Sequence, residues 1–411
     1  MQTQHFRYFF RPVLLPIVLL AMFTGRSAAA SPQIIYSFAG DKDGAYLDTD
    51  LVIDNSGNLY GTSVQGGDFA SGTVWELSPT STGWVHKVLY SFRGGADGGE
   101  PYKGATLDAQ GNLYGTAVTG GAGSCEGGCG VIWKLTRTGS TWTQSVIHTF
   151  TGGEDGSGPG SGLTLGENGT LFGMTPTGGI NGQGVIFQLK LTTTGVWKFK
   201  VLHAFTGGDD GGGASAGRLL LYKGIFYGVT TTGGANGEGV VFRLARTAGV
   251  WQFSTLYAFK GAPDAGFPYG GLAVDNAGNL YGTTYYSGTN GFGSVYEVSP
   301  QPDGTWKETV VYSFQGGTDG SGSIANLVFT NAGAIYGTTS AGGASCDCGT
   351  IFKLTSGVAG PRLESVVYRF HGAPGGAFAY NGMVGDGAGN FYGTTVHGGP
   401  SDDGVIYRLT P

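Results

Sequence analysis

Charged residues are scarce in this chain: Asp, Glu, Lys and Arg make up 12% of its 411 residues, about half of the usual quarter. Proline is scarce too, with 15 residues, and the glycines follow no strict three-residue period, which excludes a collagen triple helix. The apolar fraction of 40%, with 24 Phe, 21 Tyr and 7 Trp, is too high for a disordered tail. What the chain has in excess is glycine, with 82 residues against an ordinary usage of roughly 7%. Because interior glycine costs a helix about 1 kcal/mol relative to alanine, we expect an all-β fold with many tight turns.

The N-terminus has the pattern of a secretory signal peptide. Its first thirty residues contain three arginines and no acidic residue, an apolar stretch at residues 13–23 and a small-residue cleavage pattern at residues 28–30. The apolar stretch is too short to span a bilayer. We therefore expect cleavage after Ala30 and a mature chain, residues 31–411, that is secreted or periplasmic.

The mature chain would carry a net charge of −9, because cleavage removes three of the 22 basic residues and none of the 28 acidic ones. This charge disfavours nucleic acid and anionic membranes as partners. Long hydrophobic runs are missing beyond the signal, so we expect no membrane span after cleavage. We expect a monomer without a cofactor, whose partner is an extracellular glycan or protein.

Cysteine is also scarce, and its four residues form two close pairs, Cys125 with Cys129 and Cys346 with Cys348. Disulfides can form in an exported chain, so two local loop disulfides are one interpretation. The other is a metal site, which would require all four side chains to converge on one point. A bridge between Cys346 and Cys348 would also need a sharp turn at the single intervening residue.

One unit recurs seven times along the chain. The tetrapeptide Leu-Tyr-Gly-Thr, or a close variant, places its aromatic residue at steps of 54 to 58 residues: Tyr60, Tyr114, Phe172, Tyr227, Tyr281, Tyr336 and Tyr392. A phenylalanine that ends a Tyr-Ser-Phe-like run recurs with the same steps: Phe38, Phe92, Phe150, Phe205, Phe259, Phe314 and Phe370. Two markers in one register predict seven structural repeats.

Each repeat is predicted to form four strands, as the fifth unit illustrates. Strand length, β-branched or aromatic content and Gly or Asx punctuation predict strands at residues 271–274, 279–285, 294–299 and 306–314. An Asp-x-x-Gly turn joins the first two strands, where Asp can cap the backbone and Gly takes a positive φ. The glycine after the aromatic marker, from Gly61 to Gly393, is expected to let a neighbouring blade approach closely. A four-stranded unit of this period is typical of a propeller blade.

The two chain ends predict how the ring closes. The mature chain begins with an isolated fourth-strand sequence, residues 34–38, and ends just after a third strand, residues 405–409. Each end carries the strand that the other lacks, so the N-terminal strand should form the outer edge of the last blade. We predict one domain over residues 31–411, a closed seven-bladed β-propeller with four antiparallel strands per blade.

The repeat resembles a known family. Its Gly-Asn-Leu-Tyr-Gly-Thr core, at residues 57–62, 111–116 and 278–283, precedes Gly-Gly and then Gly-x-Val-Phe/Tyr-x-Leu, and it resembles the GloVer tandem repeat of exported bacterial "choice-of-anchor" proteins. The resemblance covers essentially the whole mature chain, although Met174 and Val229 replace Thr in two repeats. It implies export and a repeat array, and it assigns no activity or catalytic residue. Members often end in a surface-sorting segment, whereas this chain stops at its last predicted strand, so the resemblance does not extend to surface anchoring.

Two sets of Gly-rich loops should emerge on one face of the propeller, a Gly-Gly run and a Gly-Gly-x-Asp-Gly loop. The aspartate of the second loop occurs in six repeats, with Gly375 at the seventh position: Asp43, Asp97, Asp155, Asp210, Asp264 and Asp319. A ring of carboxylates could bind a cation or sugar hydroxyls. Alternatively, each aspartate satisfies the backbone of its own loop, as is common in Asp-Gly turns.

Residues that break the repeat symmetry are further candidates for a ligand site. Arg218 is the only charged residue in a first-strand column, and it could hold an anionic group in the channel or pair with a neighbouring carboxylate. The other members of that column are Leu51, Ala105, Leu163, Leu272, Leu327 and Met383. Tyr102, Tyr269 and Tyr380 share one column at the channel entrance, where they could stack on sugar rings or simply pack.

Six histidine and acidic residues in the loops and strands need separate interpretations. Four of them, near the seventh blade, could form a metal or acid–base cluster or be solvated loop residues: His371, His397, Asp402 and Asp403. His148 and His203 stand where other repeats have tyrosine, which indicates structural replacements.

These features favour an exported, non-catalytic propeller that binds an extracellular ligand through its Gly-rich loop face. The alternative is a propeller lyase or hydrolase acting on a polysaccharide or lactone-like substrate at one mouth of the channel, with Arg218, Glu100 and Lys103 as possible members of its site. The only Gly-x-Ser-x-Gly match, at residues 213–217, falls among glycines that follow the repeat period, and the sequence contains no His-Glu-x-x-His motif or phosphate-binding loop, so we assign no catalytic residue or metal site.

Overall fold

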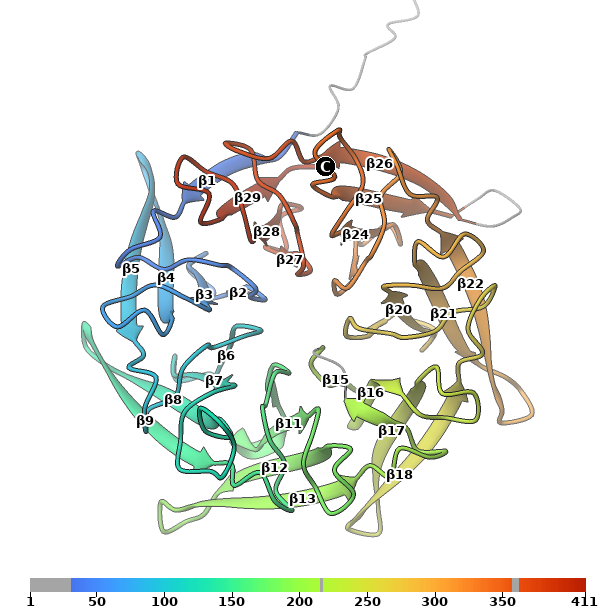
Figure 1. The fold of residues 1–411 in the computed structure, drawn as a ribbon, viewed down its shortest axis with the longest axis horizontal. Helices are drawn as coiled ribbons and strands as arrows, with labels where there is room; N and C mark the ends of the chain where they lie inside the picture. Colours follow the sequence, from blue (N-terminus) through green and yellow to red (C-terminus); the bar gives the residue numbers. More distant parts are fainter. Residues whose placement is uncertain (1–30, 215–216, 357–361) are drawn as a thin grey trace, which may run out of the picture.

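A computed structural model describes residues 31–214, 217–356 and 362–411, and the expected signal peptide lies outside these described residues. Seven antiparallel sheets stand in a ring around a central channel, with the first strand of each sheet innermost (Figure 1). Six sheets have four strands, and the fourth sheet along the chain adds a short fifth strand. The predicted seven-bladed β-propeller is therefore confirmed.

The strands follow one another outward in the first three blades, whereas in blade 4 the first two strands both pair with the third. Blade 1 contains β2 (Val52–Ile53), β3 (Leu59–Ser63), β4 (Thr73–Thr80) and β5 (Gly83–Ser91). Blade 2 contains β6 (Ala105–Leu107), β7 (Leu113–Ala117), β8 (Val131–Thr138) and β9 (Thr141–Thr149). Blade 3 contains β10 (Thr164–Leu165), the short 3₁₀ helix η1 (Glu167–Gly169), β11 (Leu171–Thr175), β12 (Val185–Leu191) and β13 (Trp197–Ala204). Blade 4 contains β14 (Gly212–Ala214), β15 (Leu220–Tyr222), β16 (Ile225–Thr232), β17 (Val240–Thr247) and β18 (Val250–Ala258).

The remaining blades keep the same order. Blade 5 contains β19 (Ala273–Val274), β20 (Leu280–Thr284), β21 (Ser294–Pro300) and β22 (Trp306–Ser313). Blade 6 contains β23 (Val328–Phe329), β24 (Ile335–Thr339), β25 (Thr350–Thr355) and β26 (Leu363–Arg369). Blade 7 contains β27 (Val384–Gly385), β28 (Phe391–Thr395), β29 (Val405–Leu409) and, as its outer edge, β1 (Gln33–Ser37).

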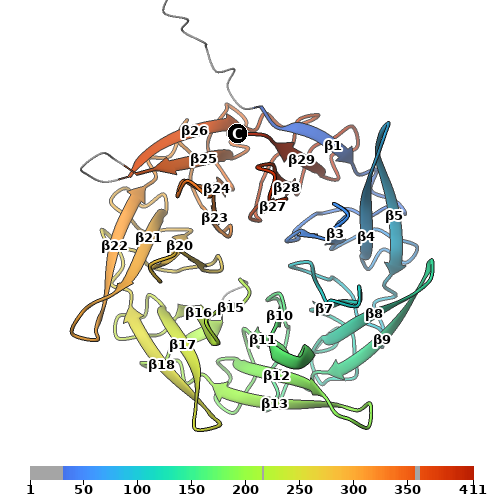
Figure 2. The same ribbon diagram turned by 180° about the vertical axis from the view of Figure 1, so that it is seen from behind.

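The ring closes as the chain ends predict. Strand β1 pairs antiparallel with β29, with Gln33 opposite Arg408 and Ser37 opposite Val405. In the view from behind, β1 continues the outer rim beside β29 and the C-terminus (Figure 2). The pairing satisfies the edge of the third strand and joins the two ends of the array.

The first strands are shorter than predicted. In blade 5 the ladder covers only Ala273 and Val274, because the backbone N–H of Gly271 donates to Oδ1 of Asn326 at 2.6 Å instead of to its own sheet. Gly271 therefore contacts the Asn326 side chain at the channel, whereas Leu272, directly before β19, is buried in the core between blades 4 and 5.

The recurring glycine of the second strand has a different role from the expected one. A Cβ atom at Gly61 would lie 2.4 Å from the ring of Trp75, its cross-strand neighbour in the same blade. The equivalent glycines of the other blades face the aromatic residue opposite them in the same way. The expectation that this glycine admits a neighbouring blade is wrong: it makes room for a ring of its own blade.

The contact between blades is made by the second marker. Each marker phenylalanine is at most 1% exposed, and Phe92, at the end of blade 1, packs its ring 5.8 Å from that of Trp133 in blade 2. Phe38 packs on Trp75 and Phe150 on Phe187 in the same manner. Each repeat therefore carries an aromatic side chain that packs over the glycine of its own blade and a marker phenylalanine that packs on the next blade.

Candidate functional site at the mouth of the central channel

The two sets of Gly-rich loops lie together on one face, as predicted. In every blade a glycine N–H of the second-to-third-strand loop donates to a carbonyl of the loop that precedes the first strand, at 2.7–3.1 Å. Gly67 to Asp41 and Gly121 to Gly95 are two of these seven bonds. This face consequently has the same backbone framework all round, and any specificity must come from side chains that differ between blades.

The six loop aspartates are held locally. Asp43, for example, accepts hydrogen bonds from the Ala39 N–H and the Tyr36 hydroxyl, both at 3.0 Å. The five others also accept from an aromatic residue seven positions earlier: Asp97 from Tyr90, Asp155 from His148, Asp210 from His203, Asp264 from Tyr257 and Asp319 from Tyr312. These contacts agree with the interpretation that each aspartate satisfies its own loop, and the structure does not bring the six carboxylates together.

His148 and His203 take the place of tyrosine in this arrangement. Their Nε2 atoms lie 3.2 and 2.9 Å from the loop aspartates, where other blades have a tyrosine hydroxyl. Burial lowers the pKa of both histidines, and each ring stacks on a phenylalanine of the next blade, His148 on Phe199 and His203 on Phe253. Both histidines therefore serve the packing between blades.

Two glutamates, Glu308 and Glu364, stand in blades 5 and 6 where blades 3 and 4 have Phe199 and Phe253, and they make stability depend on pH. Burial and the neighbouring Asp264 raise the pKa of Glu308 to about 9, and burial and Asp319 raise the pKa of Glu364 to about 7. The folded protein thus holds protons that the unfolded chain releases above its ordinary value of 4.5. The associated stability is complete below that pH and is lost as the pH rises through 7 for Glu364 and through 9 for Glu308.

We expect the melting temperature to fall between pH 5 and pH 9, and Glu308→Gln to reduce this slope and to melt a few degrees higher than the wild type at pH 9. Thermal unfolding followed by circular dichroism at several pH values measures both. Glu126→Gln, on an exposed loop, is the matched control and should keep the wild-type slope. An unchanged slope in Glu308→Gln would contradict the assignment.

Arg218 lies one position away from its predicted column. In blade 4 the aromatic marker Tyr227 pairs with Leu220, which lies seven positions earlier. In blade 3 the marker Phe172 pairs with Thr164, which lies eight positions earlier. Blade 4 has a two-residue turn, Lys223-Gly224, where other blades have a longer one. Leu219 therefore aligns with the first-strand column that contains Leu51. Arg218 aligns with the position just before that column, which is Asp50 in blade 1, Asn326 in blade 6 and glycine in the four other blades.

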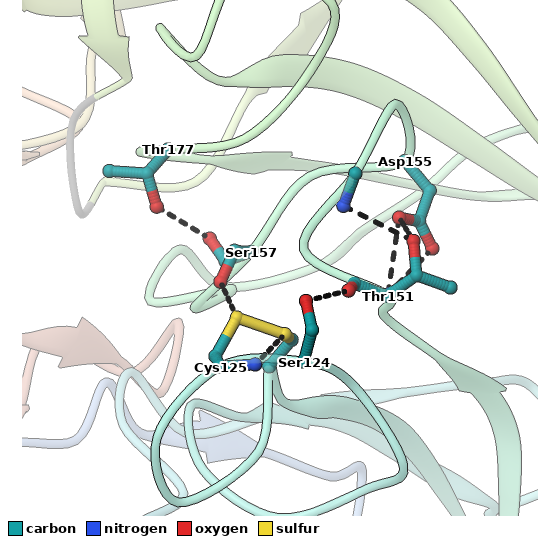
Figure 3. The surroundings of a disulfide bond; sticks show 8 residues. Ser124, Cys125, Thr151, Asp155, Ser157 and Thr177 are labelled. Atoms are coloured by element: carbon teal, nitrogen blue, oxygen red, sulfur yellow. Dashed lines mark hydrogen bonds between the residues drawn. A yellow bond between two sulfur atoms is a disulfide. The ribbon is translucent and has the colours of Figure 1, made fainter.

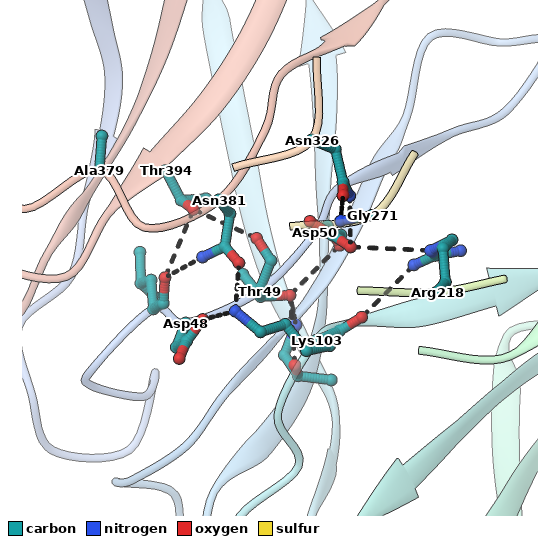
Figure 4. Close-up of polar contacts among 12 residues, drawn as sticks. Asp48, Thr49, Asp50, Lys103, Arg218, Gly271, Asn326, Ala379, Asn381 and Thr394 are labelled. Atoms are coloured by element: carbon teal, nitrogen blue, oxygen red, sulfur yellow. Dashed lines mark hydrogen bonds and ion pairs between the residues drawn. The ribbon is translucent and has the colours of Figure 1, made fainter. Parts of the chain in front are cut away.

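Charged and amide side chains from five blades meet at this level of the channel (Figure 4). Lys103 forms an ion pair with Asp48 and donates to Oδ1 of Asn381 at 3.0 Å. On the other side, Nε of Arg218 lies 3.6 Å from Oδ2 of Asp50. Asp50 also accepts a hydrogen bond from Asn326 at 3.2 Å.

This network, which we call the channel network, consists of Asp48, Asp50, Lys103, Arg218, Asn326 and Asn381. Its side chains leave a cavity of only about 10 Å³, room for roughly one water molecule. Of the alternatives left open for Arg218, the structure shows pairing with a carboxylate. Arg218 also donates to the carbonyl of Lys103 at 3.4 Å, while Glu100 lies exposed at the rim.

Tyrosine side chains surround the network on the loop side. Tyr269 and Tyr380 line the same small cavity as Asp50 and Lys103. Burial, then Glu100 and Asp48, raise the pKa of Tyr102 to about 12, and burial also raises the pKa values of Tyr46 and Tyr380. Tyr285 packs its ring 6.1 Å from that of Tyr269. Tyr102, Tyr269 and Tyr380 thus gather at the channel entrance, with Tyr46 and Tyr285 beside them; we call these five residues the aromatic mouth.

The sequence contains only a weak signal for Tyr46 and Tyr285. Tyr285 stands in a second-strand column otherwise filled by small or aliphatic residues, and Tyr46 occupies a position that is glycine in three blades. That position, eight residues after each marker phenylalanine, is left-handed in all seven blades: Tyr46 (φ 58°), Glu100 (53°), Gly158 (58°), Gly213 (57°), Phe267 (52°), Gly322 (63°) and Phe378 (59°). A non-glycine residue costs about 1–2 kcal/mol there. Three aromatic residues, Tyr46, Phe267 and Phe378, adopt this conformation in the Gly-rich loops.

The predicted cluster near the seventh blade is only partly assembled. Nδ1 of His397 lies 3.3 Å from Oδ2 of Asp402, and the His397 ring packs on Tyr46 and Phe378. His371 instead packs beside Tyr368. Burial and the neighbouring Asp43 raise the pKa of Asp403. Within the described ranges, no three His, Cys, Asp or Glu side chains group as a metal site would require.

Both cysteine pairs are joined as disulfides, with Cα–Cα distances of 5.1 Å for Cys125–Cys129 and 5.2 Å for Cys346–Cys348. They lie in loops of blades 2 and 6, so the four sulfurs do not converge on a metal. Sγ of Cys125 lies 3.1 Å from Oγ of Ser157 in the next blade (Figure 3). Asp347, between the second pair, adopts the left-handed φ of 57° that the sharp turn needs.

The chain was compared with known proteins. The model of a family described as the Gloeobacter/Verrucomicrobia repeat matches it three times, over residues 21–234, 123–321 and 217–411. No curated protein matches the sequence. In the described part of the chain, no helix is long and apolar enough to cross a membrane.

Solved structures share the fold at low identity. A protein from Lactobacillus plantarum is 11% identical, with a TM-score of 0.50, over 85% of this chain and 90% of its own. An α-L-arabinanase from Penicillium chrysogenum, solved with arabinobiose, is 14% identical, with a TM-score of 0.44, over 74% of this chain and 92% of its own. At these identities the likeness concerns the fold alone.

Proposed function

The chain belongs to the Gloeobacter/Verrucomicrobia repeat family, and we propose that it is an exported β-propeller that binds a neutral glycan, without catalysis, at its aromatic mouth. The convergence of five tyrosines from four blades at one end of the channel carries this proposal. Tyrosine offers a flat apolar ring for the C–H face of a sugar and a hydroxyl for its polar edge.

The floor of the mouth supports a neutral ligand. Lys103 pairs with Asp48 and Arg218 with Asp50, so the channel network balances its own charges. A charged ligand would have to break one of these pairs, which are largely buried. The cavity among these side chains holds only about 10 Å³, so the proposed ligand lies above them, at the rim.

The loop face offers further apolar side chains around this site. Tyr269 is 40% exposed, and Tyr286 and Phe292, in a loop of the same blade, are 57% and 45% exposed. Exposed aromatic residues grouped at one end of a propeller are typical of a binding surface. Export follows from the basic, apolar and small-residue pattern of residues 1–30.

We expect the mature protein, residues 31–411, to bind members of an array of neutral oligosaccharides. Tyr102→Ala, Tyr269→Ala and Tyr380→Ala should each weaken this binding about tenfold or more, equivalent to about 1.4 kcal/mol. Calorimetric titration with the best neutral sugar of the array measures the loss.

Phe69→Ala is the matched control, because Phe69 is a half-exposed aromatic residue of another Gly-rich loop that does not belong to the aromatic mouth. It should bind as the wild type does. Unchanged affinity in all three tyrosine variants, or an equal loss in Phe69→Ala, would contradict the proposed site. Turnover of the bound sugar would replace the binding function by the lyase or hydrolase alternative.

A further inference from the structure

A cavity of about 470 Å³ opens between blades 3 and 4, lined by strand residues, by the turns that join the first to the second strand in both blades, and by the turn between the third and fourth strands of blade 4. These turns leave the blades at the end opposite to the Gly-rich loops, so the cavity lies on the other face from the aromatic mouth. Its volume is within the range of ligand pockets, roughly 300–1,000 Å³. Residues from both blades line it.

The lining of the cavity lacks a polar cluster that four blades have at the turn between their first two strands. In blade 1, Oδ2 of Asp54 accepts hydrogen bonds from Asn58 at 2.8 Å and from the Tyr60 hydroxyl at 3.2 Å. Blade 3 has Gly166 in place of this aspartate and Phe172 in place of the tyrosine, and blade 4 has a shortened turn. No carboxylate or hydroxyl from these positions therefore fills the groove.

Three aromatic rings form its floor. The rings of Phe172 and Phe226 lie 4.1 Å apart, and Trp251 packs 5.5 and 5.7 Å from them. Phe172 and Phe226 are buried, whereas Trp251 is half-buried and faces the cavity edge. A Cβ atom at Gly166 would come within 2.6 Å of the Phe172 ring, so glycine there keeps the floor accessible.

The rim is cationic. Lys190 and Lys200 of blade 3 and Arg246 of blade 4 line the cavity, against one acidic residue, Glu167. The guanidinium of Arg246 lies 6.0 Å over the Trp251 ring, and its Nε donates to the Gly249 carbonyl at 3.0 Å, which fixes it beside the floor. This surplus of two positive charges stands out in a chain whose net charge is −6.

The groove between blades 1 and 2 is an internal reference for this charge. By repeat register, it has Asp54 where the cavity has Gly166, Glu76 where it has Gln188, and Ser78 where it has Lys190. Two acids are thus lost and one base is gained, Glu167 adds one acid where blade 1 has Asn55, and Lys87 and Arg137 match Lys200 and Arg246. By this comparison the net charge of the cavity between blades 3 and 4 is more positive by two than that of the groove between blades 1 and 2.

We propose that the cavity between blades 3 and 4 binds an acidic saccharide, a sugar ring that carries a carboxylate. The apolar face of the ring stacks on Trp251, and the carboxylate lies between Arg246 and the two lysines, of which Arg246 can contact it through two N–H groups. The Gln188 amide and the Thr170 hydroxyl line the same cavity and can bond sugar hydroxyls. This site is separate from the aromatic mouth in position and in ligand charge.

The probe is digalacturonate, with galactobiose as the uncharged disaccharide of the same ring, titrated into the mature protein and followed by tryptophan fluorescence and calorimetry. Digalacturonate should bind at least about tenfold more tightly than galactobiose, and this preference should shrink in 0.5 M salt. Lys190→Ser, which introduces the residue of blade 1, and Arg246→Gln should each reduce digalacturonate affinity about tenfold or more.

Two controls keep the result specific to this cavity. Arg243→Gln changes an exposed arginine of the same blade that does not line the cavity, and it should bind digalacturonate as the wild type does. Tyr269→Ala should also leave this binding unchanged, so that failure of the aromatic mouth and failure of this site can be told apart. The proposal is overturned if digalacturonate does not bind, if galactobiose binds equally well, or if Lys190→Ser and Arg246→Gln keep the wild-type affinity.

Discussion

Replacing Asp48 with alanine is expected to lower the free energy of unfolding by about 3–5 kcal/mol, because the ammonium group of Lys103 then stays buried without its carboxylate partner. The side chains of Lys103 and Asp48 are only 10% and 14% exposed. Lys103 still donates to Asn381, but a neutral amide cannot balance the charge. Equilibrium unfolding in guanidinium chloride at pH 7 measures the loss.

Two variants separate burial of the charge from loss of contacts. Adding Lys103→Met to Asp48→Ala removes both charges, and the double variant should recover much of the stability, because apolar replacements of buried ion pairs are often close to neutral. Asp68→Ala breaks the surface pair with Lys42, whose side chains are 59% and 86% exposed, and should change stability by less than about 1 kcal/mol. Equal losses in Asp48→Ala and Asp68→Ala would contradict burial of the Lys103 charge.

The channel network links blades that are not neighbours in the ring, because Asp50 of blade 1 contacts Arg218 of blade 4 and Asn326 of blade 6. Within the neighbouring blades 7, 1 and 2, Lys103 also links Asp48 with Asn381. The β1–β29 pairing closes the same ring at its outer edge. Near the chain ends, the ring is therefore stabilised by the β1–β29 strand pairing at its outer edge and by the buried Lys103–Asp48 ion pair at the channel.

The sequence predicts the repeat architecture because local and long-range signals agree in every unit. The two markers, Tyr60 and Phe38 in the first unit, are spaced by 22 residues in all seven repeats, and both are buried for reasons of packing that each blade shares. The closure by β1 follows from the strand missing at each end. Strand bounds were predicted to within one or two residues, as with Ser294–Pro300 against residues 294–299.

The same regular spacing hides the shift at Arg218. Phe205 and Tyr227 are 22 residues apart, as in every repeat, so counting from either marker places Arg218 among the leucines. Blade 4 adds one residue before its first strand and loses one in the Lys223-Gly224 turn, and the two changes cancel. Only the pairing of Leu220 with Tyr227 reveals that the arginine joins Asp50 in the channel network.

The candidate sites are less predictable than the fold because their residues come from different columns. Tyr102, Tyr269 and Tyr380 could be found from one column, whereas Tyr46 and Tyr285 come from two others. At the cavity between blades 3 and 4, the missing Asp and Tyr hydroxyl are visible in the repeat alignment. The cations that line it lie on strands up to 80 residues away, and their convergence needs the register of β12, β13 and β17.

A second large loss of stability is expected from a substitution in a second strand, at the glycine that packs against an aromatic ring of the same blade. Replacing Gly115 with valine should lower the free energy of unfolding by about 3 kcal/mol. A Cβ atom at Gly115 would lie 2.2 Å from Cζ2 of Trp133, whose ring is fully buried. Removing a glycine from a strand would by itself favour folding by roughly 0.5–1 kcal/mol. Overpacking a filled core costs about 1–3 kcal/mol and sometimes more, so the steric effect decides the sign.

A double-mutant cycle tests that cause. Trp133→Leu should destabilise the protein by itself, but combined with Gly115→Val it opens space for the added methyl groups, so the two losses should fall short of their sum by about 1 kcal/mol or more. Gly95→Ala, where a Cβ atom would meet no atom within 4 Å, should stay within about 0.5 kcal/mol of the wild type. Strictly additive losses would mean that the Trp133 ring does not select glycine at residue 115, and the recurrence of glycine from Gly61 to Gly393 would then need a cause outside its own blade.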